Sequence, residues 1–484
     1  MGSIYLGVDI GTTSTKCLAV GEDGEILALA QYPYSLIHPQ PGWVEQDPED
    51  YWRGLVDVVR RCVKECKDKG YREEDVTALA LSTQGGTLIL TDESGSPLMP
   101  AISWMDGRAE AECRELTDQA GAYFWEREIL HVPTPLSVAA KIRWITKSFP
   151  EIKQRKVHFC FVPDFLAKRL CGRFAIDMPS ASWSSLFSLS ERKWSENVLD
   201  LLGIPVADVS ATMESREEIG ELLQETADAL GVGRKTKLIA GAFDQAAAAY
   251  GAYAAIDDRA ILSCGTAWVL YSVTKSLVLD KLKGLCVCCH TDPAEWGLVL
   301  PFTGGAAYDW LHKTFGDTPD VSESGAEPLI FIPHLYGGLS PDWHGESRGS
   351  IMGLTLSHTR EDIRLALMRG MAFEARRNLE AGESVRGRIR SIRMVGGAGK
   401  SDIWPQMIAN ILNRPVEVSE CVESACYGAA KLAAGQVSKQ WKDTQPLRNL
   451  SPVAKDVDLE ERLYRKYLRF YEALLPIYES ESAH

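Results

Sequence analysis

The chain has 484 residues, 45% of them hydrophobic and 24% charged, and this length predicts two or three globular domains rather than one core. Its net charge of −14 argues against a nucleic-acid-binding surface. It has no apolar run of about 18 residues and no basic segment leading into an apolar one at its start, so we expect a cytoplasmic protein that neither enters a membrane nor is secreted.

The first expected element is a β-hairpin with a polar turn. The mostly apolar segments 5–9 and 17–20 predict its two strands. Small and hydroxyl residues fill the turn: Gly11, Thr12, Thr13 and Ser14. The N–H groups and hydroxyls of such a turn suit a phosphate chain, Asp9 is placed to hold Mg²⁺ through water, and Lys16 adds positive charge. An ordinary tight hairpin is the alternative.

The next elements predict an α/β fold. A third strand is expected at residues 26–30, and Asp47 followed by Pro48 predicts the start of an amphipathic helix. Two strands are expected at 77–82 and 88–91, so strands both precede and follow a helix.

Polar and aromatic residues after strand 77–82 form a candidate ligand-binding region. Gln84 and Gly85 come directly after that strand, and Trp104 and Arg108 follow. A flat aromatic ring beside hydrogen-bonding groups suits a polyol, which has apolar C–H faces and hydroxyl edges. A half-buried tryptophan with a local Asp106–Arg108 ion pair is the alternative.

The middle of the chain has weaker patterns. Helices are expected around 141–144 and 164–170, a polar loop at 176–182, and a surface helix with a connector at 216–237.

Asp244 follows an apolar strand at 238–240 and precedes small residues at 246–249 that predict a helix. A carboxylate there can simply cap the helix, and the local sequence alone favours that interpretation. The functional alternative is a general base that deprotonates a hydroxyl nucleophile.

The opening pattern returns halfway along the chain. Residues 260–271 again have the pattern of strand, turn and strand, with Gly265 and Thr266 in the turn. We therefore expect two related α/β domains, 1–245 and 246–484, with the ligand site in a cleft between them.

Cys286, Cys288, Cys289 and His290 resemble a metal-binding cluster at first sight. Their alternation with apolar residues fits a strand, and no second ligand pair follows at zinc spacing, so a strand is favoured. The twelve cysteines are scattered, which favours reduced thiols over a disulfide framework.

The last third of the chain contains a glycine turn between a strand and a helix. Expected elements are helices at 357–383, 403–412, 427–434 and 456–478, and a strand at 389–395. The strand leads into Gly396, Gly397 and Ala398, where bare backbone can take a nucleotide's base and ribose. Ser401 could hydrogen-bond that ligand and Trp404 could pack nearby; a plain strand-to-helix turn is the alternative. Gly399-Lys400-Ser401 is not a P-loop, because Met394 stands where a P-loop has its first glycine.

Together these motifs resemble the FGGY family of carbohydrate kinases over nearly the whole chain. The matching motifs are Asp9-x-Gly11-Thr12-Thr13-Ser14-x-Lys16, Trp104-x-Asp106-x-Arg108, Asp244, Cys264-Gly265-Thr266, Gly304-Gly305-Ala306 with Trp310, Gly349-x-Ile351-x-Gly353-Leu354, and Gly396-Gly397-Ala398. Within the family the chain looks most like the xylulokinase branch.

The resemblance implies two ribonuclease-H-like domains of the actin, hexokinase and Hsp70 type, and transfer of the ATP γ-phosphoryl group to a sugar hydroxyl. It implies that Asp244 is the catalytic base and that Asp9 helps to organise Mg²⁺. The implied ATP-binding residues are Gly11, Thr12, Thr13, Ser14, Lys16, Gly265, Thr266, Gly305, Trp310, Gly396, Gly397, Ala398, Ser401 and Trp404. The implied sugar-binding residues are Gln84, Gly85, Trp104, Arg108, Asp244 and Gln245.

The chain departs from the family in one loop. In this chain Gln84 is followed by Gly85, Gly86 and Thr87. Xylulokinases resemble Gln-Met-His-Gly in this loop, so their histidine is missing here. The Arg-Glu pair that glycerol kinases carry in the loop is missing too. The two glycines could leave room for a longer or differently branched sugar.

We therefore expect an ATP-dependent kinase of a ketose, first of all a pentulose such as D-xylulose. The alternatives are a kinase of another ketose, polyol or sugar acid (ribulose, a deoxyhexulose, a tetrose derivative) and a catalytically silent sugar-sensing protein on the same fold. A homodimer is one assembly that the sequence allows, and no motif identifies the hydroxyl that receives the phosphate.

Overall fold

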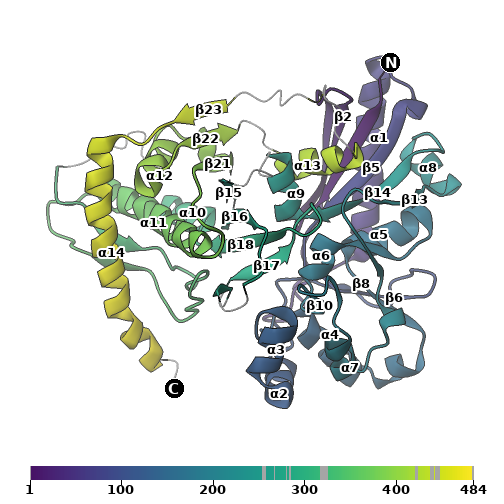
Figure 1. Cartoon of the computed structure of the whole chain (residues 1–484), viewed down its shortest axis with the longest axis horizontal. Coiled ribbons are helices and arrows are strands. Elements are labelled where there is room, and N and C mark those ends of the chain that lie inside the picture. Colours follow the sequence, from purple (N-terminus) through teal and green to yellow (C-terminus); the bar gives the residue numbers. More distant parts are fainter. Residues whose placement is uncertain are drawn as a thin grey trace. The chain divides into compact units, whose positions relative to one another are not determined.

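The computed structural model describes residues 2–252, 258–265, 267–278, 281–282, 285–316, 325–419, 423–435, 441 and 447–481. The chain forms two compact units (Figure 1). Unit 1 contains Met1–Tyr253, Val287–Gly297 and Glu423–Thr444, and unit 2 contains Ala254–Cys286, Leu298–Val422 and Gln445–His484. The division expected between residues 245 and 246 stays a prediction, and two later segments of the chain join unit 1.

A six-stranded sheet forms the centre of unit 1. Its strands, in spatial order, are β13 (Glu218–Glu221), β14 (Lys237–Phe243), β5 (Val76–Thr83), β1 (Ile4–Ile10), β2 (Ser14–Gly21) and β3 (Ile26–Pro33). Strands β14, β5 and β1 are parallel, while β1, β2 and β3 form an antiparallel meander. The carboxyl ends of three parallel strands therefore lie side by side, an arrangement that commonly carries ligand sites.

One face of this sheet packs against a core that includes residues of α1 (Pro48–Asp68), α5 (Val162–Cys171) and α8 (Gln224–Leu230). Helix α1 begins as expected, because the Asp47 side chain accepts a hydrogen bond from the Glu49 N–H and Pro48 is the first helical residue. Its buried residues include Leu55, Val59 and Cys62, which follow helical spacing.

The other face carries α9 (Asp244–Gly251) and α13 (Ser424–Ala433), which comes from far along the chain. Helix α13 approaches β1 so closely that a Cβ at Gly7 would lie 1.9 Å from the Cys426 carbonyl oxygen. Only glycine fits such a contact between backbones. Unit 1 is thus completed by residues that the sequence pattern alone would place with the C-terminal half.

Short elements extend unit 1 beyond the sheet. The helices are α2 (Glu110–Ala120), α3 (Ala122–Ile129), α4 (Val138–Ser148), α6 (Met178–Ser182) and α7 (Glu196–Leu202). Two-stranded ribbons pair β4 (Glu45–Gln46) with β7 (Ala101–Ile102), β6 (Ile89–Asp92) with β8 (Val157–Cys160), β9 (Ala175–Asp177) with β12 (Ala211–Met213), and β10 (Phe187–Ser188) with β11 (Lys193–Trp194).

Unit 2 is built around a seven-stranded sheet. Its order is β17 (Cys286–Cys289), β18 (Trp296–Phe302), β16 (Trp268–Thr274), β15 (Arg259–Cys264), β21 (Ser391–Gly396), β22 (Val416–Ser419) and β23 (Leu447–Leu450). Strand β15 is antiparallel to β16 and parallel to β21, as β1 is antiparallel to β2 and parallel to β5. The duplicated α/β pattern expected from the sequence is confirmed by this shared topology.

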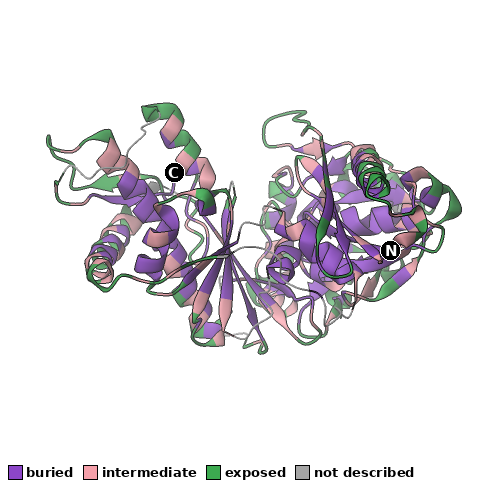
Figure 2. Ribbon diagram, turned by 90° about the horizontal axis from the view of Figure 1, so that it is seen from above, coloured by how far each residue is buried: buried purple, intermediate pink, exposed green. Residues whose placement is uncertain are grey.

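The helices of unit 2 are α10 (Gly305–Phe315), α11 (Arg360–Arg386), α12 (Trp404–Leu412) and α14 (Ala454–Glu481), and β19 (Ile330–Ile332) pairs with β20 (Ser350–Met352). Buried residues concentrate in the strands and in the helix faces that cover them (Figure 2). None of the described helices combines the length and the apolar character that crossing a membrane requires. The described cysteines carry free thiols.

Two expectations about local structure were wrong. Residues 176–182 are not a polar loop but the end of β9 and the short helix α6, because Asp177 accepts a hydrogen bond from the Ser180 N–H and Pro179 fits the first helical turn. The segment 216–237 contains the expected helix α8, but β13 was missed because a strand at the edge of a sheet tolerates its charged residues. Residues 286–289 form the strand β17, as expected.

Candidate active site

Asp9 lies near the carboxyl end of β1, beside the polar hairpin. Its Oδ1 accepts a hydrogen bond of 2.6 Å from the Ser82 hydroxyl on the neighbouring strand β5. Burial raises the pKa of the Asp9 carboxyl to about 6, although Ser82 and Lys16 both lower it. A partly buried carboxylate whose pKa is raised by its surroundings is a suitable partner for a cation.

Asp244 lies at the end of the adjacent strand β14. It is the first residue of α9 and follows the N-cap residue Phe243, so its carboxylate lies in the first helical turn, as the local sequence suggested. Its Oδ1 is buried and has no hydrogen-bond partner among the described residues. Burial and the nearby Asp9 carboxylate raise the pKa of Asp244 to about 7, while Gln245 lowers it. A group with this pKa can accept a proton near neutral pH.

Gln84 follows β5 and offers a second buried acceptor. Its Nε2 donates to Gln46 Oε1 at 3.2 Å and to the Tyr51 hydroxyl at 3.1 Å, while its backbone N–H donates to the Ile10 carbonyl at 2.9 Å. These bonds fix the amide, and its Oε1 has no partner in the part of the chain that the structure describes. Gln84 and Asp244 therefore each hold a buried oxygen that can accept a hydrogen bond from a ligand.

Trp104 lies over the hairpin turn. Its Nε1 donates a 3.0 Å hydrogen bond to the Thr12 hydroxyl, and its backbone N–H donates to the Thr87 hydroxyl at 3.2 Å. The side chain is nevertheless 42% exposed. The structure thus joins the implied sugar residue Trp104 to the implied phosphate residue Thr12.

Arg108 makes buried contacts that hold the loop carrying Trp104 in place. Its guanidinium pairs with Asp106 at 2.8 Å and Glu45 at 2.7 Å, packs on the Trp43 ring at 3.7 Å, and is only 1% exposed. A side chain so enclosed braces the loop more readily than it contacts a sugar. Lys141, which is fully buried, donates to the Ser103 carbonyl at 2.7 Å, and burial lowers the pKa of its amine to about 7.

The hairpin turn itself is held by backbone bonds. The Gly11 N–H donates to the Ser14 carbonyl at 3.0 Å, and Tyr34 N–H donates to the Thr13 carbonyl at 3.0 Å. Lys16 lies across from Asp9 on β2, and its ammonium is 2.7 Å from Glu423, so a phosphate would share that ammonium with a carboxylate.

Two residues that the sequence did not single out lie beside these groups. Trp183 stacks on Phe243 with 4.7 Å between ring centroids, next to Gly85. Ser82 could have been found, because it lies opposite Asp9 on the adjacent parallel strand. Trp183 carries no local signal, since it follows a segment whose pattern indicated a loop.

Glycines of unit 2 meet at one edge of its sheet. Strands β15 and β21 end together at Cys264 and Gly396, and the Gly305 N–H donates to the Gly265 carbonyl at 3.1 Å. Gly396 has φ +95°, and a Cβ there would lie 2.6 Å from the Cys264 carbonyl oxygen. A Cβ at Gly397 would meet no atom of the described residues within 4 Å, so the backbone there is open to a ligand. Thr266 lies outside the described residues.

Aromatic rings pack beside this glycine cluster. Trp404 contacts Trp268 and Tyr308 at centroid distances of 5.0 and 4.7 Å. Ser401 Oγ accepts hydrogen bonds from the N–H groups of residues 403 and 404 at 3.2 Å, so it holds the start of α12. Ala398 is buried, and the exposed Trp310 contacts Phe315. The structure therefore gathers Gly265, Gly305, Gly396, Gly397, Ala398, Ser401 and Trp404 in unit 2.

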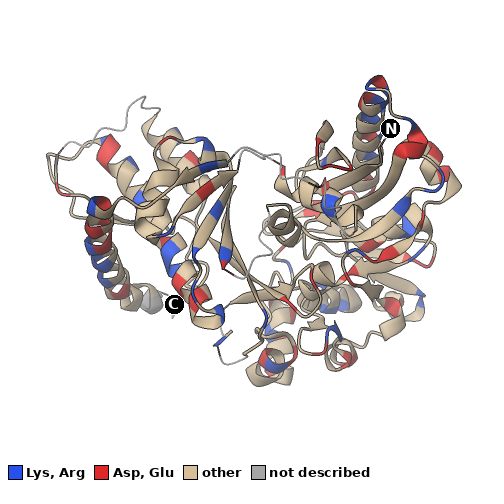
Figure 3. Cartoon of the chain, turned by 45° about the horizontal axis from the view of Figure 1, so that its top comes forward, with Lys and Arg blue, Asp and Glu red and all other residues tan. Residues whose placement is uncertain are grey.

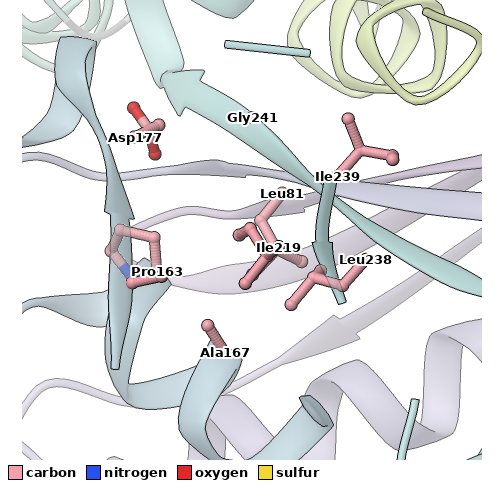
Figure 4. A pocket seen from close by; sticks show the side chains of 9 residues that line it. Leu81, Pro163, Ala167, Asp177, Ile219, Leu238, Ile239 and Gly241 are labelled. Atoms are coloured by element: carbon pink, nitrogen blue, oxygen red, sulfur yellow. The ribbon is translucent and has the colours of Figure 1, made fainter. Parts of the chain in front are cut away.

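Unit 1 also contains a small cavity that is separate from this site. It has room for about one water molecule, roughly 10 Å³, and Figure 4 shows its lining. The lining is mostly apolar: Leu81, Pro163, Ala167, Ala175, Asp177, Ile219, Leu238, Ile239 and Gly241. This volume is too small for a sugar, so the cavity is a packing gap beneath the ends of the strands.

Comparison with known proteins agrees with this geometry. Residues 4–251 match the N-terminal domain of the FGGY family of carbohydrate kinases, and residues 303–437 match its C-terminal domain. The chain is 28% identical to a xylulose kinase of Escherichia coli over 98% of its length and 100% of the relative, and 27% identical to a gluconokinase of Bacillus subtilis over 89% and 87%. The crystal structure of a xyloylose kinase from Brucella ovis superposes with a TM-score of 0.90 at 26% identity, covering 98% of this chain and 100% of that one.

The matched domains cover most of the chain, and the two-unit α/β architecture is that of these kinases. Kinases of this kind use ATP as the phosphate donor, generally with Mg²⁺, and act on a small sugar. The chain therefore belongs to the FGGY family of carbohydrate kinases and is a sugar kinase.

Proposed function

We propose that this protein transfers the γ-phosphoryl group of ATP to a hydroxyl of a ketose, with a pentulose such as D-xylulose as its preferred substrate. The single observation that carries the proposal is the Asp244 carboxyl group, whose buried Oδ1 has no partner among the described residues and whose pKa is raised by burial to about 7. The similarity to xylulose kinases supports the pentulose, and the similarity to a gluconokinase keeps other sugars open.

In the proposed reaction, Asp244 accepts the proton of the attacking hydroxyl. The hydroxyl oxygen forms a bond to the γ-phosphorus, the bond from that phosphorus to the β–γ bridging oxygen breaks, and ADP leaves with the electron pair. Because little covalent chemistry is asked of the protein, orientation and charge account for most of the rate. Gln84, Trp104 and Gln245 orient the sugar.

The residues present fit a magnesium ion. Asp9 is a hard oxygen ligand, and its raised pKa shows that its charge is poorly compensated. When bound through water at Asp9, Mg²⁺ would neutralise phosphate charge. Asp9 itself is held in place by Ser82, so its carboxylate is oriented before any ligand arrives.

We propose that two sets of backbone groups bind ATP. The hairpin of Gly11, Thr12, Thr13 and Ser14 would take phosphate oxygens in unit 1. In unit 2, Gly265 and Thr266 would do the same, and Gly305, Gly396, Gly397 and Ala398 would receive the nucleoside. Gly397 supports this role because its backbone has free space in front of it. ATP and reduced thiols also agree with a cytoplasmic enzyme.

An ADP-release assay with ATP, Mg²⁺ and a panel of sugars tests this function. The panel contains D-xylulose, D-ribulose, a 6-deoxyhexulose, gluconate and glycerol. We expect sugar-stimulated turnover with the highest kcat/KM for D-xylulose. Absence of stimulation by every sugar would refute the proposal and favour a silent sugar-sensing protein, which isothermal titration with the same sugars would detect. A higher kcat/KM for another member of the panel would refute the choice of D-xylulose.

A further inference from the structure

A tryptophan outside every sequence motif lines the region around Asp244. Trp183 is the C-cap residue of α6, and its ring is nearly parallel to that of Phe243, with 16° between the planes and 4.7 Å between the centroids. Phe243 directly precedes Asp244 and is 5% exposed, whereas Trp183 is only partly buried. Trp183 is therefore the member of the stacked pair that a ligand can reach.

Trp183 occupies the space that a side chain at position 85 would need. A Cβ at Gly85 would lie 2.3 Å from Trp183 Cδ1 and 2.9 Å from Phe243 Cε2, far inside contact distance. The indole fills the volume beside Gly85, so any room that the two glycines leave for a larger sugar lies at Gly86, and that expectation stays a prediction. Trp183 and Phe243 thus form an aromatic wall beside Gly85, although both lie far from it in the sequence.

Gly86 lies next to the indoles of both Trp104 and Trp183. A Cβ at this position would be 3.5 Å from the Trp104 Cβ and 3.9 Å from Trp183 Cδ1. Its φ of +74° favours glycine, so the backbone between the two tryptophans stays bare. Apolar C–H groups pack well against such a surface, while Gln84 and Asp244, each adjacent in sequence to this wall, supply hydrogen-bond acceptors.

The cations of unit 1 around these residues are already engaged. Arg108 pairs with Asp106 and Glu45, the Lys16 ammonium pairs with Glu423, and the buried Lys141 amine donates to the Ser103 carbonyl. Figure 3 shows Lys and Arg on helices, loops and strands, interspersed with Asp and Glu. A ligand carboxylate would meet the Asp9 and Asp244 carboxylates without a counter-charge from these described cations, and burying it there would be costly.

We infer that Trp183 is a specificity-determining residue of the sugar pocket, and that this pocket accepts neutral ketoses and polyols in preference to sugar acids. The inference rests on the proposed sugar kinase function. It narrows that function to a substrate class on three grounds: the aromatic wall, the buried acceptors of Gln84 and Asp244, and cations that already have partners. Hydroxyls of a neutral sugar would donate to the acceptors while its C–H face packs on Trp183.

Steady-state kinetics of wild type, Trp183→Gly and Trp183→Phe with D-xylulose, D-ribulose and gluconate test this inference. We expect Trp183→Gly to raise KM for the ketoses about tenfold, with KM for ATP within about twofold of wild type. Trp183→Phe keeps an aromatic ring and is expected to stay within about threefold of wild type. Wild type is expected to phosphorylate gluconate with a kcat/KM at least roughly 100-fold below that for D-xylulose.

A second experiment separates a role in the pocket from a role in folding. Gly85→Ala should lower the thermal midpoint because its Cβ strikes the indole, and adding Trp183→Gly should restore part of that loss. Tyr123→Ala, which removes an aromatic ring that is 78% exposed elsewhere in unit 1, is the matched control for kinetics.

The outcomes distinguish the inference from the function on which it rests. Wild-type protein without turnover on any sugar would refute the kinase function. Active wild type with unchanged ketose KM in a folded Trp183→Gly variant would overturn the role of Trp183. Efficient phosphorylation of gluconate would overturn the preference for neutral sugars.

Discussion

The Ser82 hydroxyl and the Asp9 carboxylate are joined by a hydrogen bond of 2.6 Å between two neighbouring parallel strands. Burial raises the pKa of Asp9, and this bond lowers it. A residue on β5 thus favours the charged form of a carboxylate on β1, against the effect of burial. The same two strands end at the polar hairpin and at Gln84, so their register places the hydroxyl donor, the carboxylate and the amide together.

Removing that hydroxyl is expected to shift the pH dependence of activity. Ser82→Ala takes away a group that lowers the pKa of Asp9, so this pKa should rise and the acidic limb of kcat should move to higher pH. The apparent KM for Mg²⁺ at pH 6.5 should also increase, by roughly threefold to tenfold. Ser195→Ala, which removes the N-cap of α7, is the control: it should lower stability without moving the pH profile.

Replacing the proposed base should stop the chemistry and spare nucleotide binding. Asp244→Asn keeps the size of the side chain but cannot accept the hydroxyl proton, so kcat should fall by roughly 10² to 10⁴. Titration calorimetry should find ATP affinity close to that of wild type. A kcat within about tenfold of wild type, a loss of only ~1.4 kcal/mol, would remove Asp244 from this role.

The same substitution should change how stability depends on pH. Burial, followed by Asp9, raises the pKa of Asp244 from 3.8 to about 7, so the folded state binds a proton that the unfolded chain releases between these values. The stabilisation from the neutral carboxyl is complete below about pH 4 and is lost as the pH rises through 7. Without ligands, Asp244→Asn should therefore unfold at a higher urea concentration than wild type at pH 8.

At pH 4 the two urea midpoints should converge, because both side chains are then neutral. Equal midpoints at pH 8 would show that Asp244 is not destabilised by its surroundings.

Two adjacent glycines in unit 2 should respond differently to alanine. Gly396→Ala introduces a Cβ at φ +95° and 2.6 Å from a carbonyl oxygen, and should cost about 1–3 kcal/mol of stability. Gly397→Ala meets no atom of the described residues within 4 Å and should leave the thermal midpoint unchanged. If Gly397 contacts the nucleotide, its variant should raise KM for ATP severalfold, and a wild-type KM would exclude that contact.

The sequence predicted what short-range patterns encode. Both hairpins, the start of α1 and the strand into Gly396 follow from apolar alternation, glycine turns and the capping residue Asp47. Helix α6 was missed because its five residues are too few for helical periodicity to appear. Trp183 could not be assigned to the site, since its position there depends on contacts with Phe243 and Gly85 that only the tertiary structure creates.

Unit 1 can complete its folding only after helix α13, near the end of the chain, has been synthesised. Its backbone fits against β1 at Gly7, yet it is synthesised almost at the end of the chain. Until it leaves the ribosome, that face of the sheet lacks its cover and is a natural target for chaperones. A gene fragment ending at Tyr253 would encode the sheet without this helix, so we expect it to aggregate rather than yield a free-standing carbohydrate-binding module.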